Sequence, residues 1–325
     1  MPQTSSPVVP HAADPSRPAA ARRHLLSLAD LSDDELYALV HRSSEHARGA
    51  VPLTGQLGGR VVGTYFRTTS TRTRTAFSVA ALRLGAQLIA YGPKDLQENT
   101  GETADDTGRV LGLMLDGLVA RTSASAQELR SIAAWDTMSV VNAMTEDEHP
   151  TQGVTDLSAM LTAVGRLEGL RVLYVGEGNN TAVALALALT RYPGAELHLR
   201  TPPGYGLPPA ALRRGQEYAA AHGAVLDEQH HMDGLPPQVD IVYTTRWQTT
   251  GTTKPDPEWR QVFRPFQVDA ALMDRCPAAV FMHDLPAHRG EEVEAGVLDG
   301  DRSIAFQQAA HKLYGAMAVL EWYLA

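Results

Sequence analysis

The sequence Phe-Arg-Thr-Thr-Ser-Thr-Arg-Thr-Arg, at residues Phe66–Arg74, joins a strand-like segment to a helix-like one. The run before it, Arg60–Phe66, is rich in valine and aromatic residues, and the run after it, Thr75–Leu84, has helical character and ends at Gly85. Ser70 is placed to act as the helix N-cap. A strand that leads through such a turn into a helix is the repeating unit of a parallel α/β sheet.

The same turn is a candidate anion site. The first turn of the helix displays free backbone N–H groups, hydroxyls and the Arg72 guanidinium, which together suit a compact dianion such as phosphate. Arg72 and Arg74 are cations at the positive end of a helix, so they require an anion or a carboxylate nearby. N-capping alone explains Ser70, and this window by itself leaves both interpretations open.

Composition limits the class of protein. The chain has 325 residues, 44% hydrophobic and 20% charged, which predicts a packed globular protein of two domains. Its net charge of -9 argues against nucleic acid or an anionic membrane as a main partner. The one cysteine, Cys276, excludes an intrachain disulfide and a cysteine-rich metal site and fits a reducing cytoplasm. No apolar span is long enough to cross a bilayer.

Strand and helix candidates alternate along the chain. Further strands are expected at Gln87–Tyr91, Gly117–Ala120, Ser139–Asn142, Leu170–Gly176, Glu196–Arg200, Ile241–Thr244 and Ala279–Met282. Further helices are expected at Thr103–Leu115, Ala126–Ala134, Thr155–Val164, Thr181–Thr190, Pro209–His222 and from Ser303 onward. This order predicts the α/β class, with two doubly wound parallel-sheet domains and a ligand cleft between them, outside the carboxyl ends of the strands.

The expected domains follow from this alternation. Residues 1–22, rich in proline, alanine and serine, are expected to form a disordered tail. Residues 23–155 are expected to form the first domain, with the helix at 303–325 packing back on it, and residues 156–302 the second.

Four clusters of polar residues lie at predicted strand ends or on the loops after them. They are Ser70-Thr71-Arg72-Thr73, Arg121, His149-Pro150-Thr151-Gln152 and His283-Asp284-Leu285-Pro286. Taken singly, each has an ordinary structural interpretation. In their order along the chain, however, they resemble the aspartate/ornithine carbamoyltransferase family. The Ser-Thr-Arg-Thr-Arg motif and the His-x-Leu-Pro-Ala-His-Arg-Gly-Glu-Glu-Val motif at residues 283–293 are highly specific to it, and the resemblance runs from His24 to the C-terminus.

This resemblance implies carbamoyl phosphate as donor, an amine-bearing amino acid as acceptor, and neither metal nor cofactor. The implied donor-binding residues are Ser70, Thr71, Arg72, Thr73, Gln97, Arg121, His149, Gln152 and Lys312. The implied catalytic residues among them are Arg72, Arg121, His149 and Gln152, because the first three would stabilise the oxyanion formed during carbamoyl transfer. Gln97 matches a residue that family members donate to a neighbouring subunit's site, which implies a homotrimer.

The implied acceptor-binding residues fit neither branch of the family. Thr245 stands where ornithine enzymes place the aspartate that binds the acceptor's α-ammonium, and Asp284 stands in place of their His-Cys-Leu-Pro cysteine. Arg246-Trp247-Gln248 is similar to the Arg-x-Gln of aspartate enzymes, whereas Asn180 matches the ornithine branch. The full expected set is Asn180, Thr245, Arg246, Gln248, Thr249, Thr250, His283, Asp284 and Leu285.

We therefore expect an acceptor other than ornithine, such as a shorter or longer diamino acid or a derivative in a specialised pathway. Ornithine itself is the second interpretation and aspartate the third. Asp284 is expected to meet an amino group of the acceptor, and Arg246 either a carboxylate or Asp284; a structural ion pair between Asp284 and an arginine is the alternative. Two other classes stay open at this point. They are a non-catalytic carbamoyl-phosphate-binding paralogue and a dehydrogenase, whose fingerprint is incomplete at residues 176–180.

Overall fold

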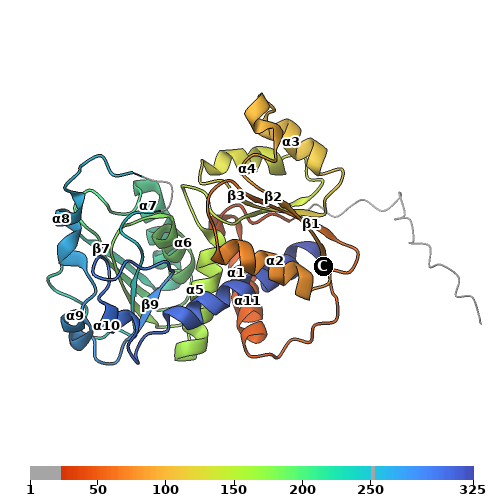
Figure 1. Ribbon diagram of the computed structural model, residues 1–325. Coiled ribbons are helices and arrows are strands. Elements are labelled where there is room, and N and C mark those ends of the chain that lie inside the picture. Colours follow the sequence, from red (N-terminus) through yellow and green to blue (C-terminus); the bar gives the residue numbers. More distant parts are fainter. Residues whose placement is uncertain (1–22, 250–252) are drawn as a thin grey trace, which may run out of the picture.

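The computed structural model describes residues 23–249 and 253–325 and consists of two lobes, each built on a parallel sheet (Figure 1). The first sheet, in the order β2-β1-β3-β4, contains β1 (Val61–Phe66), β2 (Gln87–Tyr91), β3 (Gly117–Arg121) and β4 (Ser139–Asn142). The second, in the order β7-β6-β5-β8-β9, contains β5 (Arg171–Val175), β6 (Glu196–Arg200), β7 (Val225–Gln229), β8 (Ile241–Thr244) and β9 (Val280–His283). All of these strand pairs are parallel, which confirms the predicted α/β class.

Helices cover the sheets and connect the lobes. The α-helices are α1 (Asp33–Ala47), α2 (Arg72–Arg83), α3 (Ala104–Leu111), α4 (Ala126–Ala133), α5 (Pro150–Val164), α6 (Asn180–Leu189), α7 (Pro209–His222), α8 (Trp259–Phe263), α9 (Ala270–Arg275), α10 (Ala295–Leu298) and α11 (Ala305–Leu324). Short 3-10 turns lie at η1 (Leu28–Asp30), η2 (Gln97–Thr100) and η3 (Arg264–Phe266). The last helix, α11, packs against α1, α2 and α5, so the chain end returns from the second lobe to the first (Figure 1).

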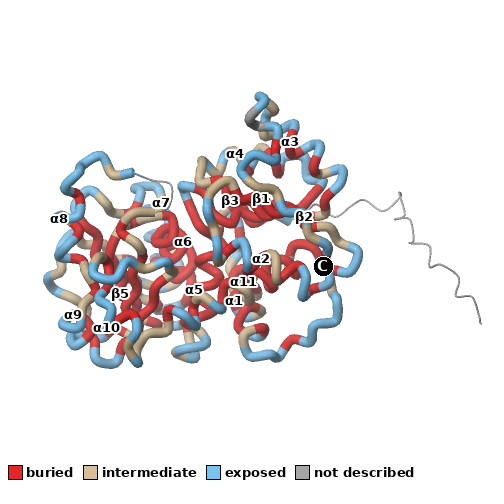
Figure 2. Tube along the Cα trace, viewed as in Figure 1, coloured by how far each residue is buried: buried red, intermediate tan, exposed pale blue. Residues whose placement is uncertain are grey.

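Three strands are completely buried, whereas the edge strand β2 is exposed. Every residue of β3, β4 and β8 is buried, as expected for parallel strands covered by helices on both faces. Figure 2 shows this buried interior in both lobes. In contrast, β2 at the edge of the first sheet has no buried residue. In the part of the chain that the structure describes, no helix combines the length and apolar character that a membrane span requires.

Three expectations about local structure were wrong. Ser70 does not cap α2, because the helix begins at Arg72 with Thr71 in the N-cap position and no side-chain cap bond. The helix expected over Thr103–Leu115 ends at Leu111, with Gly112 as its C-cap. The strand β7 was missed because Val-Leu-Asp-Glu-Gln is too polar to show an apolar run, yet it pairs with β6 at a sheet edge. The predicted tail at residues 1–22 and the candidate Thr250 lie outside the described residues.

Candidate functional site

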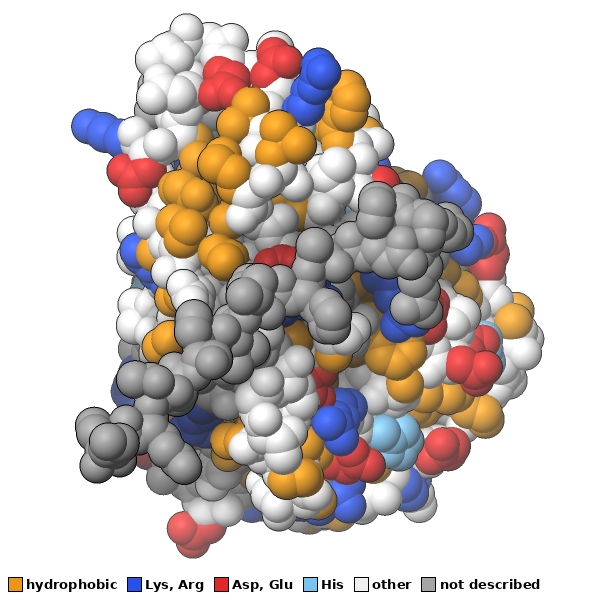
Figure 3. Space-filling model, turned by 90° about the vertical axis from the view of Figure 1, so that its right-hand side faces the viewer, with side chains coloured by type: hydrophobic (Ala, Val, Ile, Leu, Met, Phe, Trp, Pro, Cys, Tyr) orange, Lys and Arg blue, Asp and Glu red, His pale blue; other side chains and the backbone are white. Residues whose placement is uncertain are grey.

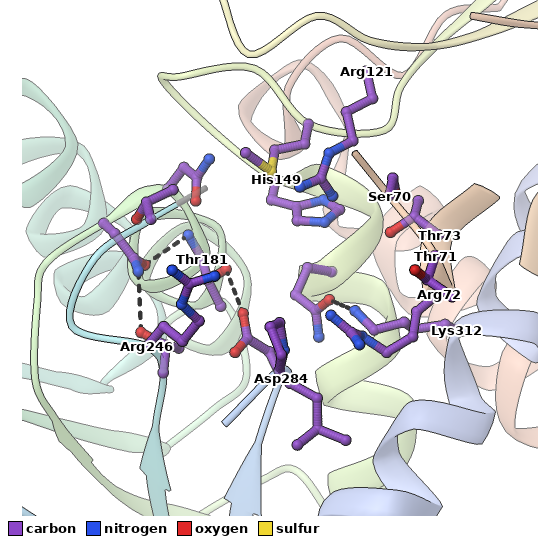
Figure 4. A pocket seen from close by; sticks show the side chains of 18 of the residues that line it. Ser70, Thr71, Arg72, Thr73, Arg121, His149, Thr181, Arg246, Asp284 and Lys312 are labelled. Atoms are coloured by element: carbon purple, nitrogen blue, oxygen red, sulfur yellow. Dashed lines mark hydrogen bonds between the residues drawn. The ribbon is translucent and has the colours of Figure 1, made fainter. Parts of the chain in front are cut away.

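A cavity of about 310 Å³ lies where the carboxyl ends of strands from both sheets meet (Figure 4). The strands β3, β8 and β9 end at or just before residues that line it, and β1 leads into it through the turn before α2. Parallel strands present their carboxyl ends at one edge of a sheet, so residues far apart in sequence converge there. The lining residues are Thr69, Ser70, Thr71, Arg72, Thr73, Arg121, Met144, His149, Gln152, Asn179, Asn180, Thr181, Thr245, Arg246, Gln248, Thr249, Asp284, Leu285, Pro286 and Lys312.

Most residues expected in the site do line this cavity, and two described ones do not. Gln97 is exposed in η2 and lies outside the cavity of its own chain. His283 is fully buried and supports the loop that follows it. Four lining residues were missed in the sequence, namely Thr69, Met144, Asn179 and Thr181. Pro286 stood in the fourth polar cluster but was assigned no role. The available signal for Asn179 and Thr181 was their position beside Asn180, at the turn from β5 into α6.

Two uncapped helix N-termini open onto the cavity. No side chain caps α2, which begins at Arg72, or α5, which begins at Pro150 after His149. The backbone N–H groups of a first helical turn lack intrahelical partners and carry partial positive charge. Because Ser70 and Thr71 do not cap α2, their hydroxyls also line the cavity without a capping role. Together these groups form the kind of site in which helix termini bind phosphate.

Four cations line the cavity: Arg72, Arg121, Arg246 and Lys312. Within residues 23–249 and 253–325, no carboxylate lies within ion-pair distance of the three arginines. The Nε atoms of Arg121 and Arg246 are buried without a hydrogen-bond partner. Burial lowers the pKa of Arg72, and it lowers the pKa of Arg121 to about 10. Buried unpaired guanidinium groups are costly, so this arrangement fits a cavity that receives an anion.

Gln152 is held in one orientation by two buried ionisable residues. The Lys312 ammonium donates a hydrogen bond to the Gln152 side-chain oxygen, and the Gln152 amide nitrogen donates to Asp156 Oδ1 at 2.6 Å. Burial lowers the pKa of Lys312 to about 8 and raises the pKa of Asp156 to about 7. Asp156 also accepts from Gln308 at 2.7 Å and from Tyr243 at 2.8 Å. This network fixes the amide of a residue expected to contact the donor.

The His149 imidazole is neutral at physiological pH. Burial, followed by the charges of Lys312 and Arg121, lowers its pKa well below the ordinary value. Figure 4 shows the ring beside the Arg121 guanidinium. The Thr151 hydroxyl lies 3.3 Å from Nδ1. A neutral imidazole that lines the cavity can donate one N–H to an oxygen that gains negative charge.

Asp284 is the one carboxylate among the described residues that line the cavity. Its Oδ2 accepts a hydrogen bond from the Thr181 hydroxyl at 3.2 Å, and its Oδ1 lies 3.5 Å from Nδ1 of His283 (Figure 4). It forms no ion pair with Arg246 or with any other described arginine. The expectation of a structural Asp284–arginine pair is therefore wrong, and so is the Arg246–Asp284 alternative.

His283 positions the Asp284 loop from behind. Its Nε2 lies 3.2 Å from Oε1 of the fully buried Glu292, its Nδ1 accepts from the Leu285 N–H at 2.8 Å, and its own N–H donates to Gln308. Both ring nitrogens are engaged inside the protein and His283 does not line the cavity, so its expected contact with the acceptor stays a prediction. Leu285 has a φ of 54°, a left-handed conformation that costs a non-glycine residue energy and is typical of ligand sites.

Two expected acceptor residues have side chains engaged by the protein. The Thr245 hydroxyl lies 3.0 Å from both the Tyr174 hydroxyl and the Asn179 amide nitrogen. Asn180 donates its amide N–H to the Thr145 carbonyl at 2.7 Å and so joins α6 to a loop of the first lobe. Thr245 therefore offers the cavity no negative charge.

One group of metal-ligand type occurs among the described residues. His288, Glu291 and Glu292 bring one ligand atom each within 4.8 Å of one another. These three residues follow the Asp284 loop and do not line the cavity. Glu292 is also engaged in a hydrogen bond with His283.

Comparisons with known proteins agree with this geometry. A family model described as "Aspartate/ornithine carbamoyltransferase, carbamoyl-P binding domain" matches residues 23–162, and one described as the "Asp/Orn binding domain" of that family matches residues 168–323. Ornithine carbamoyltransferase of Gloeobacter violaceus is 38% identical over 300 residues, which cover 92% of this chain and 95% of that protein. The solved structure of ornithine carbamoyltransferase from Pyrococcus furiosus superposes with a TM-score of 0.88 at 33% identity, covering 94% of this chain and 97% of that one. The structure of the Gloeobacter violaceus protein gives a TM-score of 0.83 at 36% identity, covering 94% and 99%.

Proposed function

The chain belongs to the aspartate/ornithine carbamoyltransferase family, and on that premise we propose that it moves the carbamoyl group of carbamoyl phosphate to a primary amine of an amino acid and releases phosphate. The resemblance found in the sequence is confirmed at the level of the family and of the enzyme class. The single observation that carries the assignment of roles is the cavity itself, with its arginines and lysine beside the uncapped start of α2.

The phosphate of the donor is assigned to the start of α2. The hydroxyls of Ser70, Thr71 and Thr73 and the Arg72 guanidinium line the cavity there. Their combination with a helix N-terminus supports a phosphate dianion at this end. Lys312 adds a cation that sits against Gln152.

The transfer needs positioning and charge stabilisation. When a neutral amine attacks the carbamoyl carbon, a C–N bond forms, the carbonyl oxygen gains negative charge, and the C–O bond to phosphate then breaks. Arg72, Arg121 and neutral His149 are assigned to that oxygen, because preorganised donors lower the barrier in such steps. The departing phosphate takes the proton that the amine loses. Gln152, whose amide is fixed by its neighbours, is assigned to the carbamoyl group.

Ornithine is one proposed acceptor, and the comparisons favour it. The relatives and solved structures reported above all carry the name ornithine carbamoyltransferase. Asn180, at the start of α6, matches the ornithine branch and lines the cavity. On this proposal the enzyme produces the ureido amino acid from ornithine.

A different diamino acid is the second proposed acceptor, and Asp284 favours it. In ornithine enzymes the aspartate that binds the α-ammonium stands at the position of Thr245, whose hydroxyl here is engaged with Tyr174 and Asn179. The carboxylate of the cavity instead comes from Asp284, on another loop. With the carboxylate at Asp284 and not at position 245, an ammonium group of the acceptor is stabilised at a different place in the cavity. Arg246 is then available to bind a carboxylate of the acceptor.

An amine panel tests both proposals. The purified protein is mixed with carbamoyl phosphate and, in turn, with ornithine, 2,3-diaminopropionate, 2,4-diaminobutyrate, lysine and aspartate. Phosphate release and the ureido product, measured by mass spectrometry, identify the acceptor. Preference for ornithine supports the first proposal and preference for another diamino acid the second. Tight donor binding with no product from any amine would contradict catalysis and favour a binding protein.

We also propose that the molecule is a homotrimer with shared sites. Large apolar side chains of the first lobe are exposed, including Leu82 at 62%, Leu113 at 79% and Met114 at 63%. Figure 3 shows hydrophobic side chains gathered on the face that lies at the right of Figure 1, the side of edge strand β2. Exposed apolar surface of this kind marks protein contacts.

Subunit mixing tests the shared site. Gln97→Ala and Arg121→Met variants, each expected to be weak alone, are unfolded, mixed and refolded together. If Gln97 enters a neighbour's cavity, hybrid trimers contain some sites with both residues intact, and activity returns. Light scattering measures the mass of the particle. A monomer, or mixtures without recovered activity, would contradict the proposal.

A further inference from the structure

Lys254 is a buried cation that belongs to none of the sites predicted from the sequence. Its side chain is 4% exposed, and it lies shortly after Gln248 and Thr249, which line the 310 Å³ cavity. Lys254 does not line that cavity itself. A buried ammonium is costly unless it is paired and surrounded by compensating groups, so its surroundings require an explanation.

Three aromatic rings and one carboxylate surround the Lys254 ammonium. The Nζ atom lies 4.4 Å from the centre of the Tyr205 ring, 4.7 Å from that of Phe263 and 5.2 Å from that of Trp259. It also donates a hydrogen bond to Oε1 of Glu177. Aromatic faces attract a cation most strongly when it is removed from water, as it is here. The four groups come from three different segments of the second lobe.

Glu177 makes two contacts with the part of the chain that follows β8, one with Lys254 and one with Thr249. Its Oε1 accepts from Lys254, and its Oε2 lies 3.5 Å from the Thr249 hydroxyl. Glu177 stands on the turn between β5 and α6, two residues before Asn179. Glu177 therefore joins the turn that carries Asn179 and Asn180 both to Lys254 and to Thr249.

The rings that hold Lys254 also hold Trp247. Phe263 lies 5.2 Å from Trp259 and 5.6 Å from Trp247, between ring centres, and all three side chains are buried in one cluster. Trp247 stands between Arg246 and Gln248, both of which line the cavity. Fixing the Trp247 ring fixes the backbone from which these two neighbouring side chains project.

We infer that Lys254 and Glu177 are positioning residues for the amine acceptor, whose ion pair inside the aromatic cluster holds Arg246, Gln248 and Thr249 against the cavity. This inference rests on the proposed function for the identity of the substrate. It assigns neither residue a contact with the reacting atoms. Because the donor end of the cavity lies at α2, in the other lobe, the pair acts on the acceptor and leaves the donor site unchanged.

The test compares steady-state kinetics of Lys254→Met and Glu177→Gln with the wild type. Methionine keeps an unbranched stem among the rings but removes the charge. We expect KM for the preferred amine to rise about tenfold in each variant, because one buried partner is lost, with KM for carbamoyl phosphate within about twofold of the wild type. Since both changes break one interaction, the double variant should be little worse than either single one.

Arg260→Met is the matched control. The Arg260 guanidinium lies 4.4 Å from the same Trp259 ring, but its side chain is 55% exposed. An exposed cation–π contact contributes little, so this variant should keep its acceptor KM within about threefold of the wild-type value. Equal KM increases in the Arg260 and Lys254 variants would overturn the inference, since general loosening of the cluster would then suffice.

Amide hydrogen exchange tests the same inference without turnover. In Lys254→Met, exchange should accelerate across residues 245–249 and stay at the wild-type rate across residues 66–74. Unchanged exchange in residues 245–249, together with an unchanged acceptor KM, refutes the positioning role. If no amine is carbamoylated by the wild type, the proposed function fails, whereas the exchange result still decides whether Lys254 holds the segment.

Discussion

The Thr181 hydroxyl donates a hydrogen bond to Oδ2 of Asp284, with 3.2 Å between the oxygens. Thr181 belongs to the first turn of α6, which follows β5, and Asp284 follows β9. The bond therefore links the ends of two strands that are separated in the sheet by β8. The bond orients the carboxylate without neutralising it. Asp284 thus presents its carboxyl group to a cavity lined by Arg72, Arg121, Arg246 and Lys312, where an amine of the acceptor is the partner we propose for it.

Asp284→Asn should therefore separate acceptor turnover from donor binding. Loss of a charge-assisted contact to an ammonium costs about 1.5–3 kcal/mol, which predicts a reduction of kcat/KM for the amine of roughly tenfold to a hundredfold. Donor affinity should stay equal or rise, because a negative charge near a dianion is removed. Calorimetry with carbamoyl phosphate and kinetics with the preferred amine measure both. Thr181→Val, which removes only the orienting bond, serves as the milder control. Unaltered acceptor kinetics in Asp284→Asn would refute the assignment.

Arg121→Met should weaken donor binding without destabilising the fold. Its guanidinium is buried, unpaired by any described carboxylate, and burial lowers its pKa to about 10. Removing an uncompensated buried charge should leave the free energy of unfolding unchanged or raise it by about 1–2 kcal/mol. Affinity for carbamoyl phosphate should fall by roughly a hundredfold. Urea unfolding and calorimetry measure the two effects. A large loss of stability would show that Arg121 has a structural partner instead.

Donor affinity should fall as pH rises above 8. The pKa of Lys312 is lowered to about 8 by burial, so the ammonium that faces the donor is lost above that pH in the free enzyme. Arg72 and Arg121 stay charged across the same range, so they do not produce this loss. In Lys312→Arg the charge persists, and affinity should be flat from pH 7 to pH 9. Calorimetric titrations at several pH values compare the two proteins. A wild-type profile identical to that of the arginine variant would contradict this role.

Asp156 should make the fold less stable as pH rises toward 7. Burial raises its pKa to about 7 in the folded protein from 3.8, so between these values the folded state holds a proton that the unfolded state has released. Stability then falls with increasing pH, by up to about 1.4 kcal/mol per pH unit from this one group. Asp156→Asn removes that slope. Urea unfolding from pH 4.5 to pH 7.5 measures it, and parallel pH profiles for the two proteins would refute the assignment.

The arrangement of the site was largely predictable because chain order and sheet topology determine it. The segments Glu196–Arg200 and Pro209–His222 have the expected bounds, since an apolar alternation and a glycine stop define them locally. Once two parallel sheets are accepted, Arg121 and Asp284 must lie at strand ends that face one cleft. Fifteen of the residues that the family resemblance implied line the cavity.

The sequence could not predict which hydrogen-bond or ion-pair partner each side chain has. His283 precedes a lining residue, but both its ring nitrogens face inward, to Glu292 and to the Leu285 N–H. Lys254 looks like an ordinary loop lysine, and only the fold brings Tyr205 and Glu177 to it. Such contacts join residues that are distant in the chain and leave no periodic pattern.

The surplus of positive charge in the cavity also sets an order of events. With one carboxylate against four basic groups, the empty cavity repels an incoming ammonium ion. Entry of a dianion offsets most of that positive surplus, so an amine approaching Asp284 is then repelled less. Bound carbamoyl phosphate thereby makes the cavity less repulsive to the amine. Without the donor, the protein would bind its acceptor weakly.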